Sequence, residues 1–117
     1  MLPKKHRLSL RKELRRVQKE GKIYHFPFFG LLVNKELEIE KQRLESRFAF
    51  IVSKKIHKKA VKRNRIKRLL RESVQLLLPK TKPGFEILFL VKKTIVDQDF
   101  KTVSQSVAES FKKIRAL

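Results

Sequence analysis

Cysteine and tryptophan are absent from this 117-residue sequence, and it has only three glycines. The lack of cysteine excludes disulfide bonds, thiolate metal sites and cysteine nucleophiles, and it fits a reducing compartment. The longest apolar runs are strand-sized and far shorter than a membrane span. The positive N-terminus has no long apolar segment behind it, which a signal peptide would need. We therefore expect a cytoplasmic protein that does not associate with a membrane.

Acidic residues are also scarce, with 11 Asp and Glu against 31 Lys and Arg, a formal charge of +20. Such self-repulsion works against a compact state unless a polyanion neutralises it. The polyanion could be nucleic acid or, as the weaker candidate, an anionic membrane surface, and we expect nucleic acid. The length and the 41% hydrophobic content suit one folded domain over residues 1–117. We expect about the first eight residues to form a basic N-terminal arm.

Hydrophobic periodicity predicts helices and strands in alternation, which indicates an α/β sandwich of helices on a small sheet. Ser9 is expected to cap the first helix and Gly21 to end it. Pro27 implies an edge position or a bulge in the β-like segment that follows. The predicted segments are a helix at 10–20, β-structure at 22–33, a polar connection at 34–46, a strand at 47–53, a helix at 57–78, a buried central strand at 85–91 and a last helix from about 100.

The segment 53–72, SKKIHKKAVKRNRIKRLLRE, has ten Lys or Arg among its 20 residues and one acidic residue, Glu72. At about 100° per residue, Ile66, Leu69, Leu70, Val74 and Leu77 fall on one side and are expected to pack on the sheet. Cations of one sign at spacings of three and four cost helix stability without a partner, so a merely solvated face is the less favoured explanation. Binding to several phosphates should be strong and steeply salt-dependent. The side opposite the apolar one carries Ala60, Asn64, Arg68 and Arg71, with Arg65 and Lys67 flanking it.

The run AVKRNRIKRLLRE at 60–72 resembles the Arg-Asn-Arg signature of the bacterial ribonuclease P protein. A bare RNR tripeptide would be a weak signal in any basic protein, but this extended form is specific. The likeness covers most of the chain. It includes Arg7-Leu8, the helix ending at Gly21, Phe29, the run IVSKK at 51–55 and Val91-Lys92-Lys93.

This resemblance implies an α+β fold similar to domain 2 of ribosomal protein S5, with the order α-β-β-β-α-β-α and a left-handed βαβ crossover. General rules favour the opposite hand. It also implies a protein subunit of an RNA-based endoribonuclease that removes the 5′ leader of precursor tRNA, with one protein per RNA subunit. The RNA subunit would hold the Mg²⁺ and do the chemistry, and no small-molecule substrate is expected. Residues implied to bind the RNA subunit are Lys54, Lys55, Arg63, Asn64, Arg65, Lys67, Arg68 and Arg71.

The family's second surface is a cleft between the first helix and the sheet, which holds the single-stranded leader. Extended RNA in a groove suits aromatic stacking and flanking cations. Aromatic residues common in the family are replaced here by Leu14, Gln18 and Leu32. The bases of the leader are therefore expected to stack on phenylalanines that the alternation of a strand places on the open face of the sheet. For each phenylalanine, a position in the core is the alternative. The expected cleft residues are Leu14, Gln18, Phe28, Leu32, Phe48 and Phe50.

The sequence offers no arrangement of protein residues for hydrolysing RNA, which needs a positioned base or a metal-bound water. The three histidines are scattered, and Asp97 and Asp99 are better explained as a helix cap than as a metal pair. Three other classes of protein remain as alternatives. They are a ribosomal protein or general RNA chaperone, a self-sufficient nuclease, and a DNA-binding protein, the last disfavoured because no helix-turn-helix pattern is evident.

Overall fold

The computed structural model describes residues 2–35, 38–39, 42–43 and 45–117. Its three long helices are α1 (Leu10–Glu20), α2 (Ala60–Leu77) and α3 (Phe100–Lys113). Short 3₁₀ turns occur at η1 (Lys4–His6), η2 (Leu78–Lys80) and η3 (Lys93–Ile95). The strands are β1 (Lys22–His25), β2 (Phe29–Asn34), β3 (Glu38–Ile39), β4 (Gln42–Arg43), β5 (Arg47–Ile51) and β6 (Glu86–Val91).

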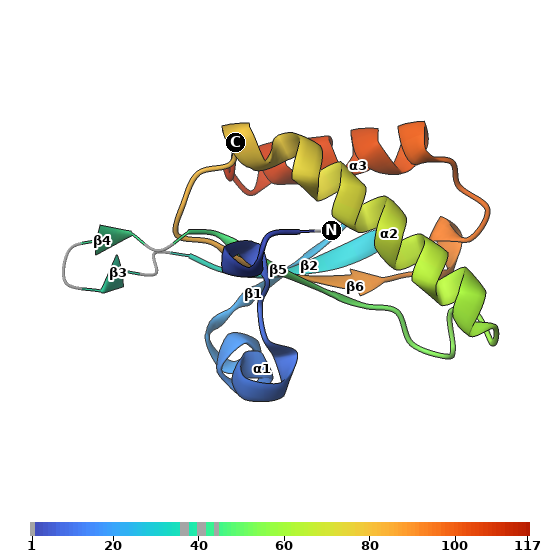
Figure 1. Cartoon of the computed structure of the whole chain (residues 1–117), viewed down its shortest axis with the longest axis horizontal. Coiled ribbons are helices and arrows are strands. Elements are labelled where there is room, and N and C mark those ends of the chain that lie inside the picture. Colours follow the sequence, from blue (N-terminus) through green and yellow to red (C-terminus); the bar gives the residue numbers. More distant parts are fainter. Residues whose placement is uncertain (1, 36–37, 40–41, 44) are drawn as a thin grey trace.

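A mixed four-stranded sheet in the order β1-β2-β6-β5 forms the centre of this α+β fold. Strand β6 is antiparallel to β2 and parallel to β5, so β5, α2 and β6 form a βαβ unit. Helices α2 and α3 cover one face of the sheet, and α1 lies on the other (Figure 1). The two-residue strands β3 and β4 pair with each other beyond the sheet. For the long helices and the four-stranded sheet, the expected α-β-β-β-α-β-α order is confirmed, as is the central, buried position of β6; β3 and β4 are additional.

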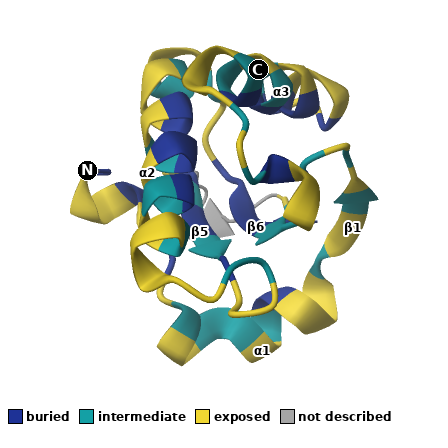
Figure 2. Cartoon of the chain, turned by 90° about the vertical axis from the view of Figure 1, so that its right-hand side faces the viewer, coloured by how far each residue is buried: buried dark blue, intermediate teal, exposed yellow. Residues whose placement is uncertain are grey.

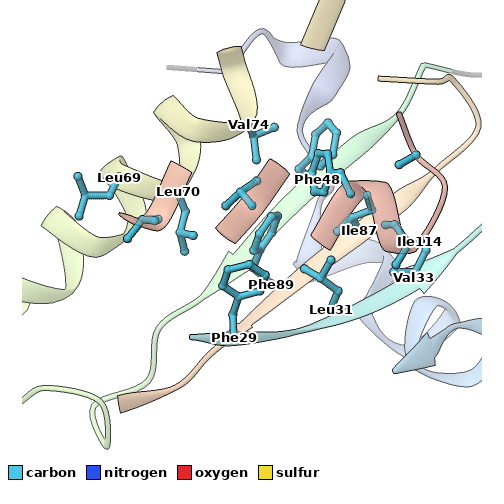
Figure 3. Close-up of a cluster of buried hydrophobic side chains, with 14 of the residues drawn as sticks. Phe29, Leu31, Val33, Phe48, Leu69, Leu70, Val74, Ile87, Phe89 and Ile114 are labelled. Atoms are coloured by element: carbon cyan, nitrogen blue, oxygen red, sulfur yellow. The ribbon is translucent and has the colours of Figure 1, made fainter. Parts of the chain in front are cut away.

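Alternation along the strands divides the apolar residues between the two faces of the sheet. Phe48 and Phe89 belong to the larger cluster, which packs under α2 and α3 (Figure 3). Ala49 and Leu88, their neighbours in sequence, belong to the smaller cluster under α1. Helix α3 completes the larger cluster with Val103, Val107 and Phe111, all fully buried.

Several predicted boundaries are wrong, for local reasons. The β-structure expected at 22–33 is confirmed as a hairpin, but Pro27 lies between β1 and β2 and not at an edge position or bulge within a strand. The connection at 34–46 contains β3 and β4, although Glu36 and Glu40 lie outside the described residues. Helix α2 begins at Ala60 rather than near 57. The carbonyls of His57 and Lys58 accept hydrogen bonds from the Arg63 guanidinium, in place of the backbone amides that would bond to them if the helix began earlier.

Helix ends also differ in how they are capped. Ser9 occupies the N-cap of α1 without a side-chain hydrogen bond. Asp99 caps α3 by accepting from the Thr102 amide at 2.9 Å, and hydrogen bonding by the Thr102 side chain and backbone lowers the pKa of its carboxyl group. Asp97 adopts a left-handed backbone conformation just before the helix. Helix capping is therefore confirmed for Asp99, as expected from the sequence.

The N-terminal arm lies against the edge of the sheet and does not extend away from it. Its Leu2, His6 and Leu8 are buried. The Leu8 amide donates to the Phe48 carbonyl at 2.9 Å, and His6 Nδ1 lies 2.8 Å from the Ser46 carbonyl oxygen. The arm therefore covers the start of β5, and its exposed cations are held at a fixed place on the surface.

Candidate nucleic-acid interface

Helix α2 lies across the sheet with its apolar side inward and its charged side outward. Ile66, Leu70 and Val74 are buried against the larger cluster, and Leu77 is half-buried. In Figure 2 the helix is buried along the side that faces the sheet and exposed along the other. Asn64 and Arg68 are exposed on the outer side, as the helical wheel predicts. The sequence therefore correctly indicated which face of this helix is available to a ligand.

The cations of α2 point in more than one direction around the helix. On the side of α3, Lys62 and Arg65 line a depression of about 270 Å³ with Asp97, and an Arg65 guanidinium nitrogen lies 3.4 Å from the Gln98 carbonyl oxygen. On the side of the N-terminal arm, Arg71 lines a second depression with Arg7. Lys67 is half-buried. The predicted RNA-binding residues on α2 thus form an outer ridge with two flanks, a broader surface than a single stripe.

The segment before α2 adds a lysine-rich depression of about 630 Å³ at the start of the helix. Lys54 and Lys55, both predicted to bind RNA, line it and are exposed. Lys93, from the segment after β6, lines the same depression although it lies far away in the sequence. No acidic residue occurs in the first turn of α2, and Lys59 occupies its N-cap. The positive charge is therefore concentrated where the helix begins.

The cations of α2 are not neutralised by ion pairs within the described part of the chain. Among the described residues, all the ion pairs found within 4.0 Å join Arg16 or Arg47 to Glu13, Glu20 or Glu86, and none involves a cation of α2. Two predicted RNA-binding residues of α2 also hydrogen-bond to the backbone: the Arg63 guanidinium donates to two carbonyls at 2.8 Å, and Arg65 donates to one at 3.4 Å. The remaining cations keep their charge available for an external anion.

The six residues expected to line a leader cleft are divided between the two faces of the sheet. Leu14 and Leu32 pack in the cluster under α1, and Gln18 is exposed on α1. Phe48 and Phe50 lie on the opposite face, because residues of their parity point toward α2 and α3. The expectation that all six line one cleft is therefore wrong.

Phe48 in particular is a core residue. Only 2% of its surface is exposed, and its ring stacks on Phe111 with centroids 5.9 Å apart. Phe28 lies in the turn between β1 and β2, half-buried against the larger cluster. Phe50 is half-buried and stacks on Phe89 at 5.0 Å. Of these two β5 phenylalanines, only Phe50 is partly exposed.

A buried ionic cluster that was not predicted from the sequence joins α1 to the sheet. Glu86, at the start of β6, has no exposed surface, and both its oxygens accept hydrogen bonds from Arg16, at 2.7 and 2.6 Å. Arg47 of β5 also donates to Glu86, and Asn34 donates at 3.2 Å. Burial disfavours the charged form of Glu86, but the hydrogen bonds and charges of the arginines outweigh it and lower its pKa. The only feature of the sequence that could have indicated this cluster is Glu86 itself, an acidic residue at the start of an otherwise apolar strand.

The described residues contain no group of three or more His, Cys, Asp or Glu side chains that could hold a metal ion. His6 is buried against Ser46, whereas His25 is exposed on β1 and His57 precedes α2, so the three imidazoles lie on separate elements. None of the helices within the described part of the chain is long and apolar enough to span a membrane.

Known proteins resemble this chain along nearly its full length. The family model described as Ribonuclease P matches residues 2–115. The ribonuclease P protein component of Caldanaerobacter subterraneus is 35% identical, over 97% of this chain and 92% of its own length. That of Clostridium botulinum is 37% identical, over 94% and 95% respectively.

Solved structures give the same match at the level of the fold. The RNase P protein from Thermotoga maritima superposes with a TM-score of 0.79 at 29% identity, covering 92% of this chain and 96% of that one. A Staphylococcus aureus RNase P protein mutant superposes with a TM-score of 0.82, covering 96% and 90%. At 22% identity this second likeness concerns the fold alone.

Proposed function

The chain belongs to the ribonuclease P protein family, and from this premise we propose that it binds the RNA subunit of ribonuclease P and the 5′ leader of precursor tRNA. As a ribonuclease P protein component, it takes part in an endoribonuclease complex of tRNA processing. In our proposal it is the non-catalytic subunit, working in the cytoplasm as one copy for each RNA subunit. The RNA would hold the Mg²⁺ ions and carry out the hydrolysis.

The observation that supports this proposal most directly is the unpaired positive surface of α2 and the segment before it. Lys54, Lys55 and Arg68 are exposed, and no ion pair to a carboxylate is found at them among the described residues. A phosphate backbone would neutralise these charges and release its own counterions, which favours association. Asn64 adds a neutral donor and acceptor at the middle of the outer ridge.

The protein's contribution to catalysis would be electrostatic and positional. The net charge of +20 reduces repulsion between the RNA subunit and precursor tRNA, two polyanions that must come together. Less Mg²⁺ would then be needed to screen the same phosphates. The benefit of the protein should therefore be greatest at low Mg²⁺.

For the leader, we retain Leu14 and Gln18 of the predicted residues and omit Leu32, which is buried. We add Ile51 and Leu90, which lie on the same side of the sheet but were not predicted. Leu14, Ile51 and Leu90 are half-buried there around the smaller cluster, and Gln18 is exposed beside them. These side chains offer an apolar surface with one polar group and no aromatic ring. We expect this surface to hold an extended strand mainly through contacts to the backbone and sugars.

The test is reconstitution of the full-length protein with a bacterial ribonuclease P RNA at low Mg²⁺, measuring 5′ maturation of precursor tRNA. We expect a large increase in the rate over RNA alone, and no cleavage by the protein without RNA. Nonspecific annealing without maturation would indicate a general RNA chaperone. Cleavage by RNA-free protein would indicate a self-sufficient nuclease.

A matched pair of variants connects the result to the proposed surface. Arg68→Gln removes a charge from the outer ridge of α2, and Lys112→Gln removes one from the exposed end of α3. The proposal predicts weaker binding of the RNA subunit for the first variant only. Equal losses in both would mean that the total charge, and not the α2 surface, decides binding.

A further inference from the structure

A small depression of about 210 Å³ lies between the N-terminal arm, β5 and α2. Water occupies about 30 Å³ per molecule in the liquid, so this space is large enough for a flat ring system. Its phenylalanines belong to the larger cluster, which faces α2, and only its Leu8 belongs to the smaller cluster on the α1 side. The lining residues are Leu2, Arg7, Leu8, Phe48, Phe50 and Arg71.

Packing and hydrogen bonds hold the residues that line this depression in place. Leu2 and Phe48 are each 2% exposed, so they provide a packed base. Phe50 lies half-buried at the side, with its ring fixed by stacking on Phe89. The hydrogen bond from Leu8 to Phe48 holds the arm to β5, and the Arg7 Nε donates to the Leu2 carbonyl at 3.0 Å.

Two guanidinium groups complete the lining of this apolar space. Arg7 is exposed on the arm and Arg71 half-buried on α2, and no ion pair to a carboxylate is found for either within the described part of the chain. A guanidinium can pair with a phosphate in bidentate fashion or stack on a flat base. The apolar lining, the half-buried Phe50 and two arginines without a carboxylate partner among the described residues together match the chemistry of one nucleotide.

We propose that this depression binds a single unpaired nucleotide of RNA, with its base against Phe50 and its phosphates between Arg7 and Arg71. The inference rests on the proposed function, because RNA binding must hold for it to matter. It adds a base-contacting site on the α2 side of the sheet, opposite the surface proposed for the leader. The nucleotide can come from two sources of the same chemistry, the precursor leader or an unpaired position in the RNA subunit.

The experiment measures binding of a single-stranded oligoribonucleotide of about six residues, a length within the usual site size, and of the same oligomer lacking all its bases. The proteins compared are the wild type, Phe50→Leu and, as a control, Phe100→Leu. Phe100 is a partly exposed phenylalanine on α3 that lines a different depression beside Glu72. Leucine preserves most of the apolar volume while removing the ring.

We expect Phe50→Leu to bind the complete oligomer about tenfold more weakly than the wild type, the typical worth of stacking one base. It should bind the baseless oligomer as the wild type does, and Phe100→Leu should bind both normally. Equal affinity of wild type and Phe50→Leu for the complete oligomer would overturn the proposal. So would an equal loss for both oligomers.

A second variant covers the case in which Phe50→Leu folds poorly. The chain has no tryptophan, so Phe50→Trp introduces a single indole that keeps an aromatic ring at the site. Its fluorescence should be quenched by the complete oligomer and unaffected by the baseless one. Quenching by neither, or by both alike, would count against a base at this position.

Two further binding measurements with the natural RNAs identify the source of the nucleotide. If Phe50→Leu weakens binding of the RNA subunit alone, the nucleotide belongs to that subunit. If it weakens only the binding of precursor tRNA with a full leader to the holoenzyme, and not that of a leaderless one, it belongs to the leader. Wild-type protein that failed to bind either RNA would refute the proposed function itself, a result distinct from normal binding without dependence on Phe50.

Discussion

Replacing Glu86 by Gln should substantially destabilise this fold, although the change removes one charge and no volume. Glu86 is fully buried and accepts hydrogen bonds from Arg16, Arg47 and Asn34. A glutamine amide keeps one acceptor oxygen and presents an NH₂ donor where two guanidinium groups already donate. The arginines would then lack their buried counter-charge.

The magnitude follows from the burial of the three groups. Removing one partner of a buried ion pair costs about 3 to 5 kcal/mol. The Arg16 and Arg47 side chains keep 35% and 24% of their surface exposed, so water offsets part of the loss. We therefore expect the lower end, about 3 kcal/mol of unfolding free energy, which corresponds to a fall in Tm of roughly 10 °C for a chain of this size.

The assay is urea unfolding of both proteins at pH 7 and at steps down to pH 3. The pKa of Glu86 is lowered below its ordinary value of 4.5, since the arginines outweigh the effect of burial. Its ionised form therefore contributes stability that is fully present above pH 4.5 and is lost as the pH falls through the lower folded value. The difference between wild type and Glu86→Gln should be largest near neutral pH and shrink in acid.

Glu72→Gln is the matched control, because Glu72 is exposed on α2 and takes no part in the cluster. It should unfold close to the wild type at every pH. A loss below about 1 kcal/mol for Glu86→Gln, the size expected for an exposed pair, would refute the reasoning. A loss that stayed constant from pH 7 to pH 3 would show that ionised Glu86 is not its source.

Three further predictions concern the interface, the core and a tight backbone contact. Arg68→Ala should lower the slope of log affinity against log salt for the RNA subunit by about one unit, measured by titration at several salt concentrations; an unchanged slope would place the contact elsewhere. Phe48→Ala should cost about 3 to 5 kcal/mol in urea unfolding, and a folded variant of normal stability would contradict its core position. Gly21→Ala should cost about 1 to 3 kcal/mol, because a Cβ there would lie 2.7 Å from the Val17 carbonyl oxygen; unchanged stability would mean that the α1 end can shift.

The order of the elements and the character of α2 were predictable because they depend on spacing along the chain. Ile66, Leu70 and Val74 recur at helical intervals, and Asn64 and Arg68 fall opposite them whatever the helix packs on. The buried run of β6 likewise distinguished a central strand from an edge. The extended Arg-Asn-Arg run carried the family resemblance for the same reason, since its residues are contiguous.

Which face of the sheet each phenylalanine occupies was decided only by the tertiary structure. Alternation along the strand shows that Phe48 and Phe50 share a face, but the positions of α1 and α2 determine which helix covers that face. The N-terminal arm pairs with β5 at Phe48, which alternation along the strand could not predict. The Glu86 cluster depends on the same kind of information. Its members come from α1, β2, β5 and β6, and they meet because strands distant in sequence align at one end of the sheet. Local patterns fix what each segment can become, whereas contacts between distant segments depend on how the whole chain packs.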